Sequence, residues 1–94
     1  DLHSFPTRRS SDLQLALGKI KPDNKKLLAK IKNNTALIIF TEGDGEKNAE
    51  KIKESVLLFS QSLDLYRELG DYESVKQVET NIMQARSALE SAEK

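Results

Sequence analysis

Residues 52–69 read Ile-Lys-Glu-Ser-Val-Leu-Leu-Phe-Ser-Gln-Ser-Leu-Asp-Leu-Tyr-Arg-Glu-Leu, and Gly70 and Asp71 follow them. Apolar side chains recur here every three or four residues, at Ile52, Val56, Phe59, Leu63 and Tyr66, with Leu58, Leu65 and Leu69 beside them. This spacing places them along one side of an α-helix. Gly70 can adopt the left-handed conformation that ends a helix, and Asp71 can cap the next one. The stretch therefore predicts a helix that ends at Leu69 and a second helix directly after it.

The second helix continues the same spacing toward the C-terminus. Its apolar positions are Val75, Val78, Ile82, Ala85 and Leu89. This three-four alternation predicts a helix that reaches Ser91 or beyond. The predicted fold class is all-α.

A third helix is expected upstream, over about residues 25–41. Its apolar or small positions recur at three and four residues: Leu27, Leu28, Ile31, Asn34, Ala36 and Ile38. Pro22 predicts a loop over residues 19–24, after which Asp23 or Asn24 would cap the helix. Gly43-Asp44-Gly45 is expected to break it.

One alternative concerns residues 35–41, a short and partly β-branched apolar run that also suits a buried strand. Gly43-Asp44-Gly45 would then be a strand-to-helix loop of the kind that binds phosphate. The helical interpretation is favoured, because the register continues back to Leu27 without a breaker and the full glycine-rich pattern is missing.

The first 13 residues differ from the rest. Translated back into codons, Asp1–Leu13 resembles a common short-read sequencing adapter read in one frame. We expect residues 1–13 to be a non-native, disordered tail and residues 14–94 to be a fragment of a longer protein. Leu13, Leu15 and Leu17 predict the stub of a helix that ends near Gly18.

Composition narrows the function further. The 94 residues include 15 Lys and Arg against 15 Asp and Glu, and no Cys. Balanced charge gives no argument for nucleic acid or an anionic membrane, and no run approaches the roughly 18 apolar residues of a membrane span. The charge is uneven, however: residues 19–32 carry six lysines and one aspartate, whereas residues 64–94 carry seven acids and four bases. We expect a soluble, cytoplasmic protein that binds neither nucleic acid nor membrane.

Residues suited to catalysis are scarce. The single histidine, His3, lies in the atypical tail, and without cysteine the chain has no thiol nucleophile. The acidic residues Glu42, Asp44, Glu46 and Glu50 do not have the spacing of a calcium-binding loop. Asn33-Asn34-Thr35 matches a glycosylation acceptor by chance. We therefore expect no enzyme activity, no cofactor and no metal.

Three segments resemble the tetratricopeptide repeat. Residues 34–44 resemble its first helix, residues 55–65 its second, and residues 66–71 the turn of a longer variant of the repeat. Asn81-Ile82 restarts the first-helix pattern. The chain departs from the family at Thr35, Met83 and Arg86 and in about seven extra residues before Ile52.

The resemblance implies antiparallel helix-turn-helix units of an α-solenoid, with about one full repeat and a helix on either side. Small residues such as Ala36, Ser55 and Ser62 would let helices approach, and Phe40, Phe59 and Tyr66 would fill the spaces between them. By the same resemblance, the first helices line a concave surface that holds a peptide or protein. Its candidate residues are Lys30, Asn33, Asn34, Leu37, Thr41, Gln77, Asn81 and Gln84.

The expected function is thus a scaffold for protein interactions. Two alternatives remain: an antiparallel bundle or coiled coil that self-associates through the seam from Val75 to Leu89, and a regulatory arm of a larger enzyme. About three repeats are usually needed for a stable stack. We therefore expect a marginally stable chain that self-associates through its open helical ends.

Overall fold

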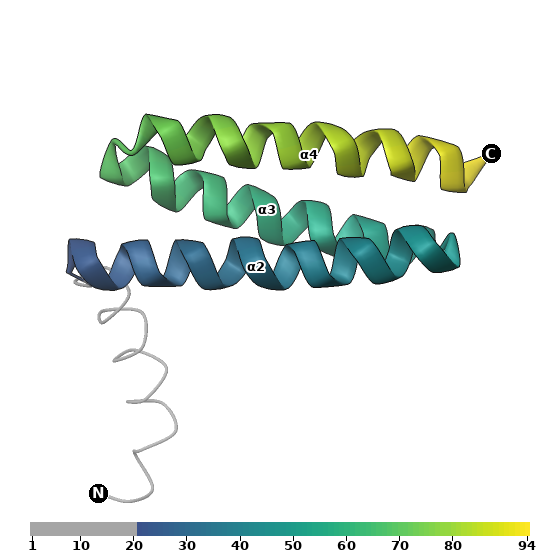
Figure 1. Ribbon diagram of the computed structural model, residues 1–94, viewed down its shortest axis with the longest axis horizontal. Helices are drawn as coiled ribbons and strands as arrows, with labels where there is room; N and C mark the ends of the chain where they lie inside the picture. Colours follow the sequence, from purple (N-terminus) through teal and green to yellow (C-terminus); the bar gives the residue numbers. More distant parts are fainter. Residues whose placement is uncertain (1–20) are drawn as a thin grey trace, which may run out of the picture.

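The computed structural model describes residues 21–94, which form three α-helices and no strand. They are α2 (Pro22–Glu46), α3 (Ala49–Leu69) and α4 (Tyr72–Glu93). Consecutive helices run antiparallel, with α2 at one edge of the view in Figure 1 and α4 at the other. The predicted all-α, helix-turn-helix arrangement is confirmed, and the strand alternative for residues 35–41 is wrong because they lie inside α2. The expectations for residues 1–13 and for the stub at residues 13–17 lie outside the described part.

The turn between α3 and α4 forms as predicted. Gly70 adopts a left-handed conformation (φ 71°), and its N–H donates to the carbonyl of Arg67. Asp71 caps α4: one carboxylate oxygen accepts from the backbone N–H of Ser74 at 3.3 Å, and the other accepts from the Ser74 hydroxyl at 2.8 Å. These hydrogen bonds satisfy a backbone donor that the first turn of a helix otherwise leaves open.

The turn between α2 and α3 lies later than expected. The helix passes through Gly43-Asp44-Gly45 and ends at Glu46, and Lys47 follows it as a left-handed cap residue with φ 56°. The predicted break is wrong because Gly43 serves packing: a Cβ there would lie 2.9 Å from the Cβ of Lys51, at the start of α3. The side chain of Asn48 then caps α3, accepting from the N–H groups of Glu50 and Lys51.

The start of α2 also differs from the prediction. Pro22 is the first helical residue, and Lys21 precedes it without a side-chain cap. Proline suits this position because its fixed φ is helical and its missing N–H would have no helical partner there. The predicted loop at Pro22 and cap at Asp23 or Asn24 are therefore wrong. Asp23 instead lies in the first turn, where its carboxylate interacts favourably with the positive end of the helix dipole.

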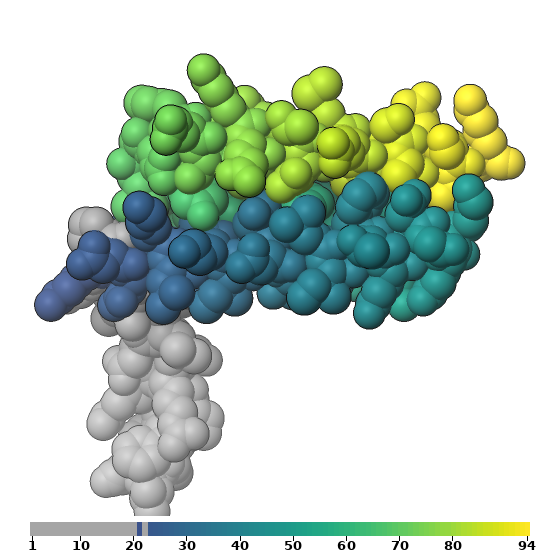
Figure 2. Space-filling view, viewed as in Figure 1, coloured from purple at the N-terminus to yellow at the C-terminus, as the bar shows by residue number. Residues whose placement is uncertain are grey.

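The core is built mainly by α3 and α4, whose predicted stripes are confirmed. Ile52, Phe59 and Val78 are fully buried or nearly so, and Ser55 and Ser62 are buried with them. From α2 the core takes small residues seven apart: Ala29, Ala36 and Gly43. The prediction that the large apolar residues of this helix face the core is thus partly wrong. Leu27 and Ile38 are more than half exposed, and Ile31 is half exposed. Side chains of α2 and α4 also meet in the space-filling view (Figure 2).

Candidate functional site

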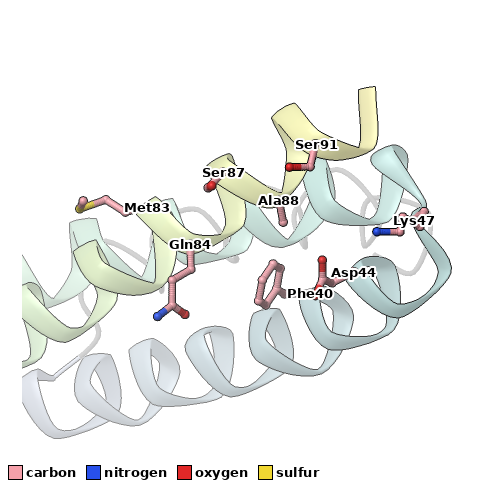
Figure 3. Close-up of a pocket in the computed structure, with 8 residues that line it drawn as sticks. All are labelled: Phe40, Asp44, Lys47, Met83, Gln84, Ser87, Ala88 and Ser91. Atoms are coloured by element: carbon pink, nitrogen blue, oxygen red, sulfur yellow. The ribbon is translucent and has the colours of Figure 1, made fainter. Parts of the chain in front are cut away.

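An open groove of about 620 Å³ lies between α2 and α4. Phe40 of α2 and Ala88 of α4 are both half-buried and point toward each other in Figure 3. The other lining residues are mostly polar: Asp44, Lys47, Met83, Gln84, Ser87 and Ser91. The groove thus combines apolar surface with hydroxyl, amide and charged groups.

A pair of asparagines joins the same two helices. The side-chain Nδ2 of Asn81 donates to Oδ1 of Asn33 at 3.2 Å, across 48 residues of sequence. Both side chains are half-buried. An amide carries both a donor and an acceptor, so this bond occupies only one group of each residue.

Three of the eight candidate residues from the sequence come together along this side of α2 and α4. Asn33 and Asn81 are hydrogen-bonded, and Gln84, one turn after Asn81, lines the groove. Lys30 and Gln77 are exposed. They lie one turn before Asn33 and Asn81, and therefore on the same sides of their helices.

The other three candidates lie elsewhere on α2. Leu37 and Thr41 line a smaller hollow with Ile38 and Glu42, and the hydroxyl of Thr41 donates to the carbonyl of Leu37 at 2.8 Å. Asn34 is exposed and lies between Ile31 and Ile38 in the helical spacing. The α2–α4 groove is not lined by Leu37, Thr41 or Asn34.

Several lining residues were missed in the sequence. The sequence predicts a helix break at Gly43-Asp44-Gly45 and therefore does not place Asp44 on a helix face beside Phe40. Ala88 and Ser91 continue the spacing of Asn81 and Gln84 by three and four residues, and this periodicity could have identified them.

Two acidic residues near the α2–α3 turn form ion pairs with a lysine side chain of α3. The Nζ of Lys51 lies 3.1 Å from a carboxylate oxygen of Glu46 and 3.8 Å from one of Glu42. The hydrogen bond to Glu46 raises the pKa of Lys51 above its ordinary value. Within residues 21–94, no group of three or more carboxylate, imidazole or thiol side chains could hold a metal ion.

None of the three described helices is both long enough and apolar enough to cross a membrane. Comparison of the chain with protein-family models, with curated proteins and with solved structures found no match.

Proposed function

We propose that this chain is a tetratricopeptide-like interaction module that holds an extended peptide segment in the groove between α2 and α4. The observation that carries the proposal is the hydrogen-bonded pair of Asn33 and Asn81, which lies on the same side of the two helices as the open groove around Phe40. The two helices correspond to the first helices of successive repeats in the resemblance. A scaffold needs such a surface and no reactive group.

The groove and the asparagine pair beside it offer the chemistry that a peptide backbone requires. The remaining donor of Asn33, the remaining acceptor of Asn81 and the amide of Gln84 can hydrogen-bond the N–H and C=O groups of an extended chain. The ring of Phe40 and the side chain of Met83 offer apolar contact to one of its side chains. From Asn33 to Asp44, α2 rises about 16 Å, which matches about five extended residues.

Selection from a displayed library of random peptides tests the proposal. The selected peptides should bind the wild-type chain, and Gln84→Ala should weaken them roughly three- to tenfold, the effect of one lost hydrogen bond. Arg86→Ala is the matched control. It also shortens an exposed polar side chain of α4, but two residues away and so on another side of the helix. Failure to select any peptide, or equal loss in both variants, would contradict the proposed groove.

A bundle or coiled coil that self-associates would need a surface other than the seam from Val75 to Leu89 that the sequence suggests. Val75, Val78, Ile82 and Ala85 belong to the buried core of the chain itself, packed with residues of α3. The seam from Val75 to Leu89 is thus already used within one molecule, which favours the peptide-binding proposal over self-association through α4.

A further inference from the structure

The side of α2 that faces away from α3 carries large apolar side chains in the open. Leu27 is 56% exposed, Ile31 50% and Ile38 62%. Their spacing of four and seven residues places them along one line of the helix, with Asn34 between them. We call Leu27, Ile31, Asn34 and Ile38 the outer stripe. In Figures 1 and 2 α2 forms one edge of the described helices.

The two halves of α2 carry opposite charge. Residues 22–34 hold four lysines and one aspartate, whereas residues 35–46 hold Glu42, Asp44 and Glu46 and no basic residue. Lys51 of α3 contacts two of these carboxylates, and Glu68 of α3 lies 4.0 Å from Lys25, so α3 offsets only part of the charge on each half. A helix with this pattern attracts an antiparallel copy of itself and repels a parallel one. The dipoles of the two α2 helices also favour antiparallel over parallel pairing.

We propose that two copies of this chain pair through the outer stripe, with their α2 helices antiparallel. Ile31 and Ile38 lie symmetrically about the peptide bond between Asn34 and Thr35. A two-fold axis beside that bond brings Ile31 of one copy against Ile38 of the other, twice. Each basic half of α2 then lies along the acidic half of the second copy.

This surface is separate from the peptide-binding groove. Asn33 and Phe40 lie toward α4, whereas the outer stripe lies on the opposite side from the buried Ala29, Ala36 and Gly43. Pairing through the outer stripe leaves the groove open, so a failure of one proposal does not affect the other.

Sedimentation of the full chain from low to high micromolar concentration tests the pairing. The wild type should change from monomer to dimer, and Ile38→Ser should weaken dimerisation roughly tenfold or more, because the substitution removes two side chains from a symmetric interface. Leu57→Ser is the matched control, since Leu57 is similarly exposed (59%) but belongs to α3. A monomer at all concentrations, or equal loss in both variants, would overturn the proposal.

Single cysteines test the orientation, because the chain has no native cysteine. Asn34→Cys lies next to the proposed axis and should form a disulfide-linked dimer under mild oxidation, since its two copies come within the roughly 7 Å between Cα atoms that a disulfide spans. Glu42→Cys should not, because antiparallel pairing holds its two copies about 22 Å apart. Cross-linking of Glu42→Cys at an equal rate would indicate parallel pairing, and absence of cross-linking at Asn34→Cys would exclude the outer stripe. Either result would overturn the proposal.

Discussion

The hydroxyl of Ser62 in α3 donates a hydrogen bond of 2.7 Å to the backbone carbonyl of Ala29 in α2, 33 residues earlier. Both residues are fully buried. A side chain as short as serine reaches a carbonyl of the neighbouring helix only when the two backbones are close, and the methyl group of Ala29 leaves room for this approach. The contact explains why α2 turns its small residues, and not its leucines and isoleucines, toward α3.

Substitution of Ser62 tests this close approach. Ser62→Ala should cost about 0.5 to 1.5 kcal/mol of unfolding free energy, through loss of one hydrogen bond. Ser62→Leu should cost about 1 to 3 kcal/mol or more, because the added side chain has no space. Urea denaturation would measure both. Ser60→Ala, whose hydroxyl bonds only to Val56 within α3, is the control and should change stability by less than about 0.5 kcal/mol. A tolerated Ser62→Leu would disagree with this packing.

Phe59 is the largest fully buried side chain of the described core. Phe59→Ala should therefore reduce the unfolding free energy by about 3 to 5 kcal/mol, through lost apolar burial and the cavity that remains. Leu57→Ala, two residues away and 59% exposed, should cost less than about 0.5 kcal/mol. Both values can be measured by urea denaturation followed by circular dichroism. A cost under about 1 kcal/mol for Phe59→Ala would mean that this stripe does not face the core.

Local signals made α3 and α4 predictable from the sequence. Gly70 and Asp71 act within one turn of their own positions, and the apolar stripes of α3 and α4, which include Phe59 and Val78 respectively, face the core. In α3 and α4 the local preference of each residue agrees with its position in the fold, so the spacing of apolar residues alone predicts both helices.

Tertiary packing made α2 harder to predict. Gly43 has the properties of a helix end but lies inside the helix, because α3 begins against it. Ile38 has the properties of a core residue but is exposed, because Ala36 occupies the contact with α3. Tertiary packing also limits how much of the candidate site the sequence predicts. Asn33 and Asn81 are hydrogen-bonded across 48 residues, and no local pattern contains this pairing. Asn34, one position after Asn33, lies on another side of the helix.

The two glycines near the end of α2 should respond oppositely to alanine. A Cβ at Gly43 would lie 2.9 Å from Cβ of Lys51 and 3.1 Å from the backbone nitrogen of Ile52, so Gly43→Ala should destabilise the chain by about 1 to 3 kcal/mol. Around a Cβ built at Gly45, no atom of the described residues lies within 4 Å, apart from those of the chain neighbours and the adjoining turns of α2 itself. Gly45→Ala should stabilise by roughly 0.5 to 1 kcal/mol through helix propensity. Thermal unfolding should show shifts of opposite sign, and shifts of the same sign would contradict this account.

The cap at Asp71 should make part of the stability depend on pH. The hydrogen bond from the Ser74 hydroxyl, and then that from its backbone N–H, hold the pKa of Asp71 below its usual value of 3.8. As the pH falls, the unfolded chain therefore binds a proton at this carboxylate before the folded chain does. The stabilising effect of the carboxylate is complete above about pH 5 and disappears as the pH falls through the lowered pKa.

Asp71→Ala should accordingly lower the melting temperature most near pH 6, and the difference from the wild type should narrow below about pH 4. Asn48→Ala is the matched control, because the Asn48 side chain caps α3 in the same way but cannot ionise. Its loss should cost about 1 kcal/mol at each pH over the same range. Calorimetry of the three proteins from about pH 6 to pH 2.5 measures both differences. If the difference for Asp71→Ala stayed as constant as that for Asn48→Ala, the carboxylate charge would not contribute to the cap, and the hydrogen bonds from Ser74 would stabilise α4 only through their geometry.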